Sequence, residues 1–341
     1  MTEAVHYPFP SIEQFRHVVK KVTERATFAG LDENDEQKFD PTAKRPILHF
    51  EGTVKLHGTN AAIVFPPEGG VQFQSRERVL SAESDNAGFF AHFAERSDAV
   101  RNLWGVAQDL YRVGPISIYG EWCGGNIQKG VAITGLPKMF VIFAVRCADL
   151  WLPVDGRLEN TDAGVYCITN FPRFEIDIDF ESPHDAQNEL VDITNSVEAQ
   201  CPVGSRFDRV GTGEGVVWRC TTPGWESSQF WFKVKGEKHS ETKVKTLAEV
   251  DVEALRQVGE FVARVVTDAR LEHALQHLTA ELQKPFEMPS MGDFLRLVFN
   301  DILKEEADTI AASGFDTKKL GGPISLAAKR WFIARLNGET K

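Results

Sequence analysis

The chain has 341 residues, of which 42% are hydrophobic and 26% charged, so it can bury the cores of about two domains. Its formal net charge of −11 argues against a protein that coats nucleic acid without specificity, because affinity for phosphates is mostly electrostatic, but it permits a local basic groove. No apolar run is long enough for a membrane helix, and the N-terminus lacks the pattern of a signal peptide, so we expect a cytoplasmic protein.

The first predicted element is a helix over residues 11–28, in which apolar residues recur at helical spacing and Ser11 can cap the start. Beyond it, up to residue 235, the pattern changes to short strand-like runs separated by Gly, Pro and Asn. These runs cover residues 45–56, 61–75, 116–122, 138–147, 214–220 and 230–235. One helix near residues 86–112 interrupts them.

Helical periodicity returns in the last third of the chain. We expect a long amphipathic helix over residues 251–282, a second helix over 290–312 that ends near Gly314, and a third over 325–337 that ends at Gly338. The sequence therefore predicts a sheet-rich α+β domain over residues 1–240 and a small all-α domain over residues 241–341. The hinge between them is expected in residues 236–250.

Several common functional motifs are missing from the sequence. It has no GxGxxG dinucleotide turn, no P-loop and no GxSxG elbow. The five cysteines form no CxxC pair and are expected to be reduced thiols. His273 and His277 lack the glutamate of an HExxH motif, so we expect them on an exposed helix face and not at a zinc ion.

Lys55 stands out because it follows an apolar residue at the end of a strand-like run and precedes Leu-His-Gly. A lysine amine is a poor nucleophile at its ordinary pKa of about 10.4, so a catalytic lysine needs apolar surroundings or neighbouring cations. Taken alone, such a lysine is more often the solvent-facing residue of an edge strand. Five later motifs favour the catalytic interpretation.

Six sequence motifs follow one another in a recognisable order. They are KLHGTN at 55–60, SRE at 75–77, YGEWCG at 119–124, FVIFAV at 140–145, EGVVWR at 214–219 and FKVKGEKHSE at 232–241. In this order the chain resembles the covalent nucleotidyltransferases, and among them the ATP-dependent RNA ligase 2 family of phage duplex-RNA ligases and kinetoplastid RNA-editing ligases. The similarity extends to GNIQKGV at 125–131 and to the helix-like segment 294–310, so it covers nearly the whole chain.

The resemblance implies an α+β nucleotidyltransferase fold, unrelated to ATP-grasp, whose antiparallel sheets flank an ATP cleft. It implies that Lys55 attacks the α-phosphorus of ATP and holds AMP, which then passes to the 5′-phosphate of an RNA end and is displaced by a 3′-hydroxyl. The expected function is an RNA ligase that uses ATP and Mg²⁺, with Mn²⁺ as an alternative, chiefly at nicks in duplex or splinted RNA. No membrane partner is expected, and the sequence does not indicate an oligomeric state.

The resemblance also assigns roles to residues that would surround ATP. Lys233 and Lys235 alternate with apolar residues, so they leave one strand face, where they would bind the α-phosphate and favour the neutral amine of Lys55. Glu121 would accept hydrogen bonds from the ribose, and Phe143 would stack on the adenine. The plainer interpretations are an exposed strand face for the lysines, a rim carboxylate for Glu121 and a core position for Phe143.

Further roles follow from the same resemblance. Glu214 would orient Lys55 or a metal-bound water and ligate the metal ion, and Arg76 and Asn60 would hold the AMP phosphate and the RNA ends. His57 replaces the aspartate found in DNA ligases and capping enzymes and would assist adenylylation. Each of these residues also has a plain interpretation, as a turn carboxylate, a surface arginine, a turn asparagine or a locally hydrogen-bonded histidine.

Two positions depart from the family pattern, and both would adjoin the nucleotide. Val54, expected to contact ATP, stands where an acidic residue is common, and Ala144 stands where aspartate is common. RNA would also meet the basic pairs near the C-terminus, which are Lys318, Lys319, Lys329 and Arg330. Two alternative functions stay open: a capping-type guanylyltransferase, and a module that binds nucleotide or RNA without turnover.

Overall fold

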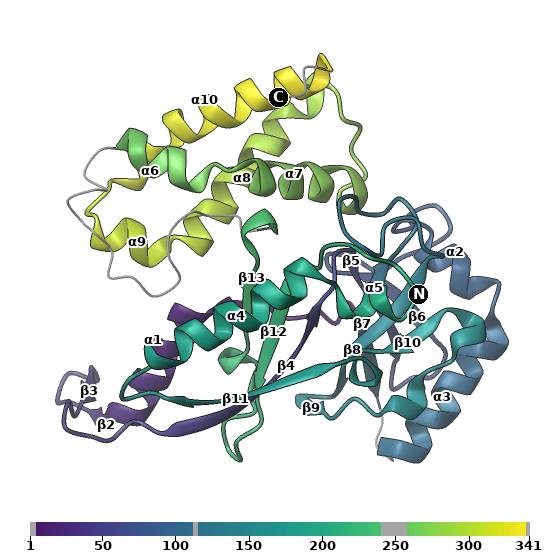
Figure 1. Cartoon of the computed structure of the whole chain (residues 1–341), viewed down its shortest axis with the longest axis horizontal. Helices are drawn as coiled ribbons and strands as arrows, with labels where there is room; N and C mark the ends of the chain where they lie inside the picture. The colour runs from purple at the N-terminus through teal and green to yellow at the C-terminus, as the bar shows by residue number, and fades with distance from the viewer. Residues whose placement is uncertain (1–4, 112–114, 240–257, 339–341) are drawn as a thin grey trace. The chain divides into compact units, whose positions relative to one another are not determined.

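A computed structural model of the chain describes residues 5–111, 115–239 and 258–338 (Figure 1). It divides into two compact units, residues 1–236 and residues 237–341. The first is a mixed α+β unit and the second is helical, which confirms the predicted fold class. All five cysteines are free and buried. Among the described residues, no helix combines the length and apolar character that a membrane span requires.

The first unit contains a five-stranded sheet in the order β1-β13-β12-β4-β11. The strands are β1 Glu13–Gln14, β4 Ile47–Lys55, β11 Arg173–Asp179, β12 Gly215–Cys220 and β13 Phe232–Lys235. All neighbours are antiparallel except β1 and β13, a parallel edge pair that the prediction of antiparallel sheets missed. Because β4 alternates between buried and half-buried residues, one face of the sheet is apolar and the other carries polar side chains.

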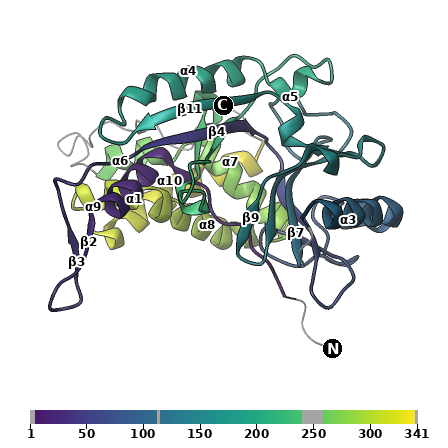
Figure 2. The ribbon, with the colours of Figure 1, turned by 90° about the horizontal axis from the view of Figure 1, so that it is seen from below.

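Two helices, α1 Phe15–Thr27 and α4 Asp185–Ala199, cover the apolar face of this sheet, and Figure 2 shows α4 running along β11 and β4. On α1 the ring of Phe15 packs against Phe232 of β13, with the ring centroids 4.8 Å apart. On α4 the buried side chains recur at helical spacing, at Ala186, Leu190, Thr194 and Val197. The opposite face of the sheet is thereby left for polar chemistry.

A six-stranded sheet makes up the rest of the first unit. Its strands are β5 Thr59–Phe65, β6 Gln72–Ser75, β7 Ile116–Cys123, β8 Met139–Cys147, β9 Leu150–Leu152 and β10 Val165–Cys167. The helices α2 Phe89–Ala94 and α3 Ser97–Tyr111 pack on one face over a core rich in phenylalanine. The other face carries a smaller apolar cluster around Tyr119 and Ala144. Of its pairings, only β8 with β10 is parallel.

Shorter elements complete the first unit. A hairpin of β2 Phe28–Leu31 and β3 Gln37–Phe39 follows α1, and α5 Pro202–Ser205 follows α4. Short 3-10 turns lie at Gly156–Leu158, Thr161–Ala163, Ile168–Asn170 and Ser228–Phe230.

The second unit is a helical bundle around its own apolar core. Its elements are a 3-10 turn at Glu237–His239, α6 Val258–Val265, α7 Asp268–Gln276, a π-helical turn His277–Glu281, a 3-10 turn at Met288–Ser290, α8 Met291–Glu305, α9 Ala307–Ala312 and α10 Thr317–Leu336. A buried ion pair lies inside it: Arg270, 1% exposed, pairs with Asp301 at 2.7 Å and with the fully buried Glu306 at 3.4 Å. A buried cation of this kind requires such partners.

Two predictions about the first unit's helices are wrong. The first helix begins at Phe15 with Gln14 as its N-cap, not Ser11, because Glu13 and Gln14 pair with β13 as a short strand. The helix predicted over 86–112 is two helices, α2 and α3, which are separated at residues 95–96.

The helices of the second unit differ from the predicted bounds. The one predicted over 251–282 is broken before α7, where the Thr267 hydroxyl accepts a hydrogen bond from the main-chain N–H of Arg270 at 3.3 Å; residues 251–257 lie outside the described residues. The helix predicted over 290–312 is interrupted at Glu306. The third begins earlier than expected, at Thr317, where the Asp316 carboxylate accepts from a main-chain N–H. Most of the predicted hinge, residues 240–250, also lies outside the described residues.

Candidate active site

Strand register brings three lysines to one face of the five-stranded sheet. Gly215 of β12 pairs with Lys55 of β4 on one side and with Lys235 of β13 on the other. Lys233 stands two residues from Lys235, in the next row on that face. Because residues in register share a face, the three ammonium groups leave the sheet together, away from α1 and α4.

Glu214, which immediately precedes β12, holds this cluster together. Its side chain is only 3% exposed; Oε1 lies 2.8 Å from Lys55 Nζ and 3.4 Å from Lys235 Nζ. Its other oxygen, Oε2, lies 3.1 Å from Nδ1 of His57. Burial alone would raise the pKa of Glu214, but Lys55, Lys235 and His57 outweigh it and hold the pKa well below the ordinary range. The group is therefore a buried carboxylate anion inside a cage of donors.

Glu121 of β7 is a second carboxylate in the same site. It lies opposite Asn60 of β5, and its Oε1 accepts a hydrogen bond from the main-chain N–H of Gly58 at 2.9 Å. Burial raises the pKa of Glu121 to about 7; the charge of Lys55 opposes this rise and that of Glu214 adds to it. Two carboxylates close to the same lysine thus have opposite pKa shifts.

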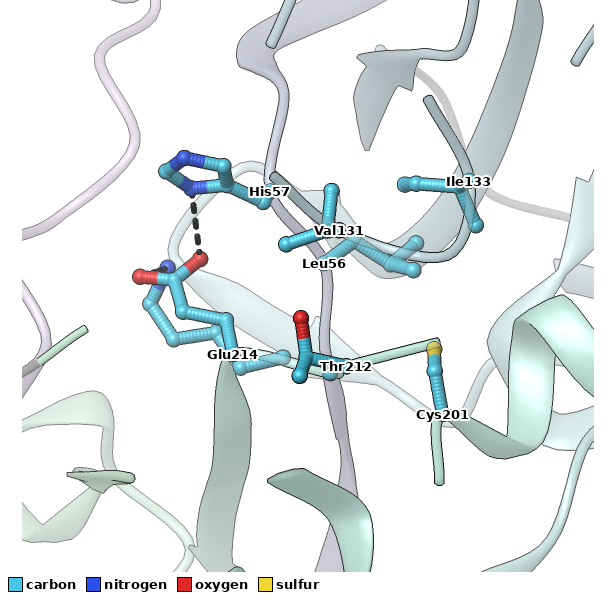
Figure 3. A pocket seen from close by; sticks show the side chains of 9 residues that line it. Leu56, His57, Val131, Ile133, Cys201, Thr212 and Glu214 are labelled. Atoms are coloured by element: carbon cyan, nitrogen blue, oxygen red, sulfur yellow. Dashed lines mark hydrogen bonds and ion pairs between the residues drawn. The ribbon is translucent and has the colours of Figure 1, made fainter. Parts of the chain in front are cut away.

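Lys55, His57 and Glu214 are among the residues that line a small pocket (Figure 3). The side chains drawn there include the apolar groups of Leu56, Val131 and Ile133, and the dashed line marks the contact between His57 and Glu214. Apolar side chains thus close one side of the site. This lowers the local dielectric and strengthens the attraction between Glu214 and its donors.

Two glycines in the motifs are required by close packing, although sequence reasoning did not single them out. A Cβ on Gly215, whose φ is +153°, would lie 2.1 Å from the carbonyl oxygen of Val234. A Cβ on Gly58 would lie 2.4 Å from the carbonyl oxygen of Trp122. Both contacts are impossible for a side chain, so both positions require glycine. The only sequence signal was the presence of glycine in EGVVWR and KLHGTN.

Two more residues were missed by sequence reasoning. Gln128, in the segment 125–131, donates from Nε2 to the carbonyl oxygen of Gly58 at 3.3 Å and so supports the turn after Lys55. Arg219 of β12 is in register with Glu51 on the same sheet face as Lys55 and stacks on the ring of Trp231, 4.2 Å from its centroid. Burial lowers the pKa of Arg219 to about 10. No local pattern in the sequence indicated either residue.

Phe143 lies on the six-stranded sheet, which also carries Glu121, and Arg76 lies just beyond this sheet. Arg76 follows β6, half-buried, and its charge acts on Glu121. Phe143 is the extra residue of a β-bulge, because Tyr119 pairs with Ala144 while Gly120 pairs with Ile142. It is only partly buried and lies with Ala144 and Tyr119 on the sheet face that also carries Glu121. Ala144 is fully buried there in an apolar cluster, where an aspartate would be costly.

The structure does not bring every predicted residue to this cluster. The Val54 side chain is 4% exposed on the opposite face of β4, in register with the buried Val216. A nucleotide on the Lys55 face could meet only its main chain. Lys329 and Arg330 are exposed on α10 in the second unit. Lys238, in the motif FKVKGEKHSE, belongs to that unit too.

The described residues contain no ready-made metal site. In the ranges 5–111, 115–239 and 258–338, no group of three or more His, Cys, Asp or Glu side chains is arranged to hold a metal ion. Glu214 and Glu121 supply carboxylate oxygens, but both oxygens of Glu214 already face nitrogen donors. Mg²⁺ usually takes one or two carboxylates together with substrate phosphates, and this donor set fits that mode of binding.

Comparison with known proteins places this geometry in a family. The model of a family described as RNA ligase matches residues 48–235, which include Lys55, Glu121, Glu214 and Lys235. The chain belongs to the RNA ligase family. No curated protein matches it.

Solved structures of an RNA ligase from Naegleria gruberi are also similar to this chain. A point mutant without ligand is 17% identical over 67% of this chain and 55% of the Naegleria chain, with a TM-score of 0.42. Another mutant, with ATP and manganese, is 16% identical over 67% and 56% of the two chains, with a TM-score of 0.43. The match thus spans little more than half of the Naegleria protein. At these scores the family assignment depends on the family model alone.

Proposed function

We propose that the protein is an ATP-dependent RNA ligase that joins 3′-hydroxyl and 5′-phosphate ends of RNA, at nicks in duplex or splinted strands. The reaction passes through AMP bound to Lys55 and then through adenylylated RNA. The observation that carries the proposal is the cluster of Lys55, Lys235 and His57 around one buried carboxylate, Glu214, at 2.8, 3.4 and 3.1 Å. Membership of the RNA ligase family supports it.

The geometry suits transfer of AMP to a lysine. Nζ of Lys55 must lose a proton to solvent before it attacks the α-phosphorus, and Glu214 Oε1, 2.8 Å away, orients the nitrogen for this attack. A nitrogen–phosphorus bond then forms while the bond to pyrophosphate breaks. Lys235 and Lys233 stand beside Lys55 on the same sheet face, where their charges stabilise the extra negative charge on the phosphate as the bonds change. His57 keeps the Glu214 carboxylate in position.

The remaining residues of the first unit would bind the nucleotide. Glu121 faces the ribose hydroxyls, and Phe143 on the same sheet face stacks on the adenine. Asn60 lies next to Glu121 on the neighbouring strand, and Arg76 follows the strand beyond it; these two residues hold the AMP phosphate and the RNA ends. Val54 contributes its main chain only.

Magnesium, with manganese as a substitute, would be held mainly by the ATP phosphates and by Glu214 among the protein groups. When bound, it supplies positive charge that stabilises the phosphate oxygens during transfer. Glu214 is the nearest carboxylate to Lys55, but its present bonds to nitrogen donors mean that it would exchange at least one of them for the ion.

The two units divide the work in this proposal. Residues 1–240 form the adenylyltransferase domain, and residues 241–341 form a helical domain that helps to grip RNA. On α10 the exposed side chains of Lys329 and Arg330 contact RNA phosphates weakly. The KLHGTN and FKVKGEKHSE motifs favour the ligase 2 branch, with its preference for nicked duplexes, within the RNA ligase family.

The direct test is labelling of the protein with ATP that carries ³²P at the α-phosphate. Wild type should acquire acid-labile, base-stable AMP, whereas Lys55→Ala should acquire none because the attacking nitrogen is gone. Lys38→Ala is the matched control, since Lys38 is an exposed strand lysine on β3, and it should label like wild type. Equal labelling of Lys55→Ala and wild type would refute the assignment.

The same assay separates the alternatives. A capping-type guanylyltransferase would prefer α-labelled GTP to ATP. A module that binds without turnover would take up neither label and would retain a nicked RNA duplex without sealing it under ATP and magnesium. The proposed ligase labels with ATP and converts the nicked duplex to a continuous strand.

A further inference from the structure

Hydrogen bonds fasten the N-terminal segment, residues Val5–Phe9, to the six-stranded sheet, and the buried side chain of Gln74 makes two of them. Gln74 of β6 is 1% exposed, and its amide bonds the main chain of Tyr7 in both directions: Oε1 accepts from the Tyr7 N–H at 3.1 Å, and Nε2 donates to the Tyr7 carbonyl. The hydroxyl of Tyr119 donates to the same carbonyl at 3.0 Å. Because burying an amide is costly unless it is fully bonded, this arrangement fixes the path of the segment.

Phe9, at the end of this segment, is the centre of an aromatic cluster. Its ring centroid lies 5.1 Å from Phe143, 5.2 Å from Tyr119, 5.6 Å from Trp151 and 6.3 Å from Trp231. Three of these rings belong to the six-stranded sheet, while Trp231 directly precedes β13 of the five-stranded sheet. Phe9 therefore links the sheet that carries Phe143 to the sheet that carries the lysines.

Phe143 depends on such a neighbour more than an ordinary strand residue does. As the extra residue of a β-bulge it lacks a register partner, so the ladder constrains its side-chain direction less. The rings of Phe9 and Phe143 are arranged in a T-shape, with the ring planes at 63°. This is a favoured aromatic geometry, and in it Phe9 covers at most one of the two faces of the Phe143 ring.

We propose that Phe9 is a positioning residue for nucleotide binding. The hydrogen bonds of Tyr7 to Gln74 and Tyr119 hold Phe9 in place, and Phe9 keeps the ring of Phe143 in the orientation that stacks on the base of ATP. The proposal rests on the proposed function, in which Phe143 contacts adenine. The cluster around Phe9 consists of aromatic rings and does not include Lys55. Removal of Phe9 should therefore weaken ATP binding and leave the transfer of AMP intact.

The test compares Phe9→Leu with wild type in single-turnover labelling of Lys55 over a range of ATP concentrations. The variant should raise the ATP concentration for half-maximal rate about 5- to 10-fold, the factor expected when one aromatic pair is removed, and change the rate at saturating ATP less than about twofold. The dissociation constant of α,β-methylene ATP, measured by calorimetry, should rise by a similar factor.

Two further variants keep the test specific. Phe93 is a buried phenylalanine that packs on the opposite face of the same sheet, with its ring centroid 5.9 Å from that of Phe140. Phe93→Leu should lower the stability of the protein but leave ATP binding unchanged. Gln74→Met removes the side-chain hydrogen bonds to Tyr7 without changing the aromatic cluster itself, and it should weaken ATP binding as Phe9→Leu does. This variant keeps the test usable if Phe9→Leu folds poorly.

The decisive comparison is the double variant Phe9→Leu with Phe143→Leu. If Phe9 acts through Phe143, the double variant should bind ATP no more weakly than Phe143→Leu alone. Additive effects, or equal effects of Phe9→Leu and Phe93→Leu, would overturn the positioning role while the labelled wild type upholds the proposed function. A wild type that takes up no label would overturn both.

Discussion

At the scale of single residues, Glu214 and Glu121 show how one site can hold two carboxylates in different states. Three nitrogen donors surround Glu214 and outweigh its burial, whereas burial dominates at Glu121. At neutral pH Glu214 is therefore an anion, and Glu121 is close to the middle of its titration. A proton on Glu121 would turn one of its acceptor oxygens into a donor.

This difference predicts a pH dependence of stability. The pKa of Glu121 is raised from 4.5 to about 7 on folding, so the folded state binds more protons between these values, and the free energy of unfolding falls as the pH rises from 4.5 to 7. Glu121→Gln cannot titrate, so its stability relative to wild type should rise across this window, by about 1 to 3 kcal/mol once solvent screening is allowed for. Urea unfolding of both proteins from about pH 5 to about pH 8 measures the difference. A difference that is constant with pH would contradict the prediction.

The order of the motifs in the sequence predicted that Lys55, His57, Glu214 and Lys235 belong to one site. The alternation of apolar and charged residues along one strand predicted that Lys233 and Lys235 lie on the same face. Sequence reasoning could not find the direct contact of His57 with Glu214, because that contact depends on the register of β4 against β12. Nor could it show that Val54 turns to the core. Without the strand boundaries, the position just before Lys55 could belong to either face of the strand.

At the scale of elements, the site depends on the pairing of β12 with β13, which we call the seam. Their pairing aligns Gly215 with Lys235, and the space above Gly215 is already filled by the main chain of β13. The seam therefore couples the position of Lys235 to the close approach of the two strands.

Gly215→Ala should separate this seam. The added Cβ would force the Val234 carbonyl away, so we expect a decrease of at least about 2 kcal/mol in the free energy of unfolding together with slower adenylylation of Lys55. The matched control is Gly105→Ala, at an exposed helical position of α3 with no atom within 4 Å of the new Cβ. That variant should be neutral or more stable by up to about 1 kcal/mol, since alanine favours helix. Urea unfolding and ATP labelling of both variants provide the measurements; equal behaviour would refute the role of the seam.

The strands predicted from alternation and turn residues are present as β4, β5, β6, β7, β8, β12 and β13. The elements missed were those whose pattern is weak or interrupted. The buried stripe of α4 includes Ala186 and Thr194, which are too small or too polar to indicate a helix from the sequence. The interruption between α8 and α9 lies at Glu306, whose buried carboxylate pairs with Arg270. Because the two residues are far apart in the sequence, this ion pair leaves no local pattern from which the interruption could be predicted.

At the scale of the whole molecule, the acidic total charge contrasts with the basic surface of α10. Lys318, Lys319, Lys329 and Arg330 are all exposed on this helix. None of the four pairs with an acidic side chain within the part of the chain that the structure describes. Because the chain as a whole has a net charge of −11, its affinity for RNA should depend strongly on such local cations and on the salt concentration.

The double variant Lys329→Ala/Arg330→Ala should weaken binding of a nicked RNA duplex about equally for all sequences. It should also reduce the slope of log affinity against log salt by about 2, one for each phosphate that the helix no longer neutralises. Arg335→Ala is the control on the same helix, because Arg335 already pairs with Glu272 at 2.7 Å, and it should leave the slope unchanged. Filter binding between about 50 and about 300 mM KCl gives the slopes. Identical slopes for wild type and the double variant would exclude α10 from the RNA interface.

The burial of all five thiols makes this chain convenient for site-specific chemistry. Maleimide dyes react with accessible thiolates, so the native cysteines should stay unlabelled while the protein is folded. A cysteine introduced at exposed Lys38 and another at exposed Leu326 would then take up a donor and an acceptor fluorophore, with every natural cysteine left in place. Single-molecule measurements of the energy transfer between the two dyes would report the distance between the units in the free protein, after addition of ATP and after addition of RNA.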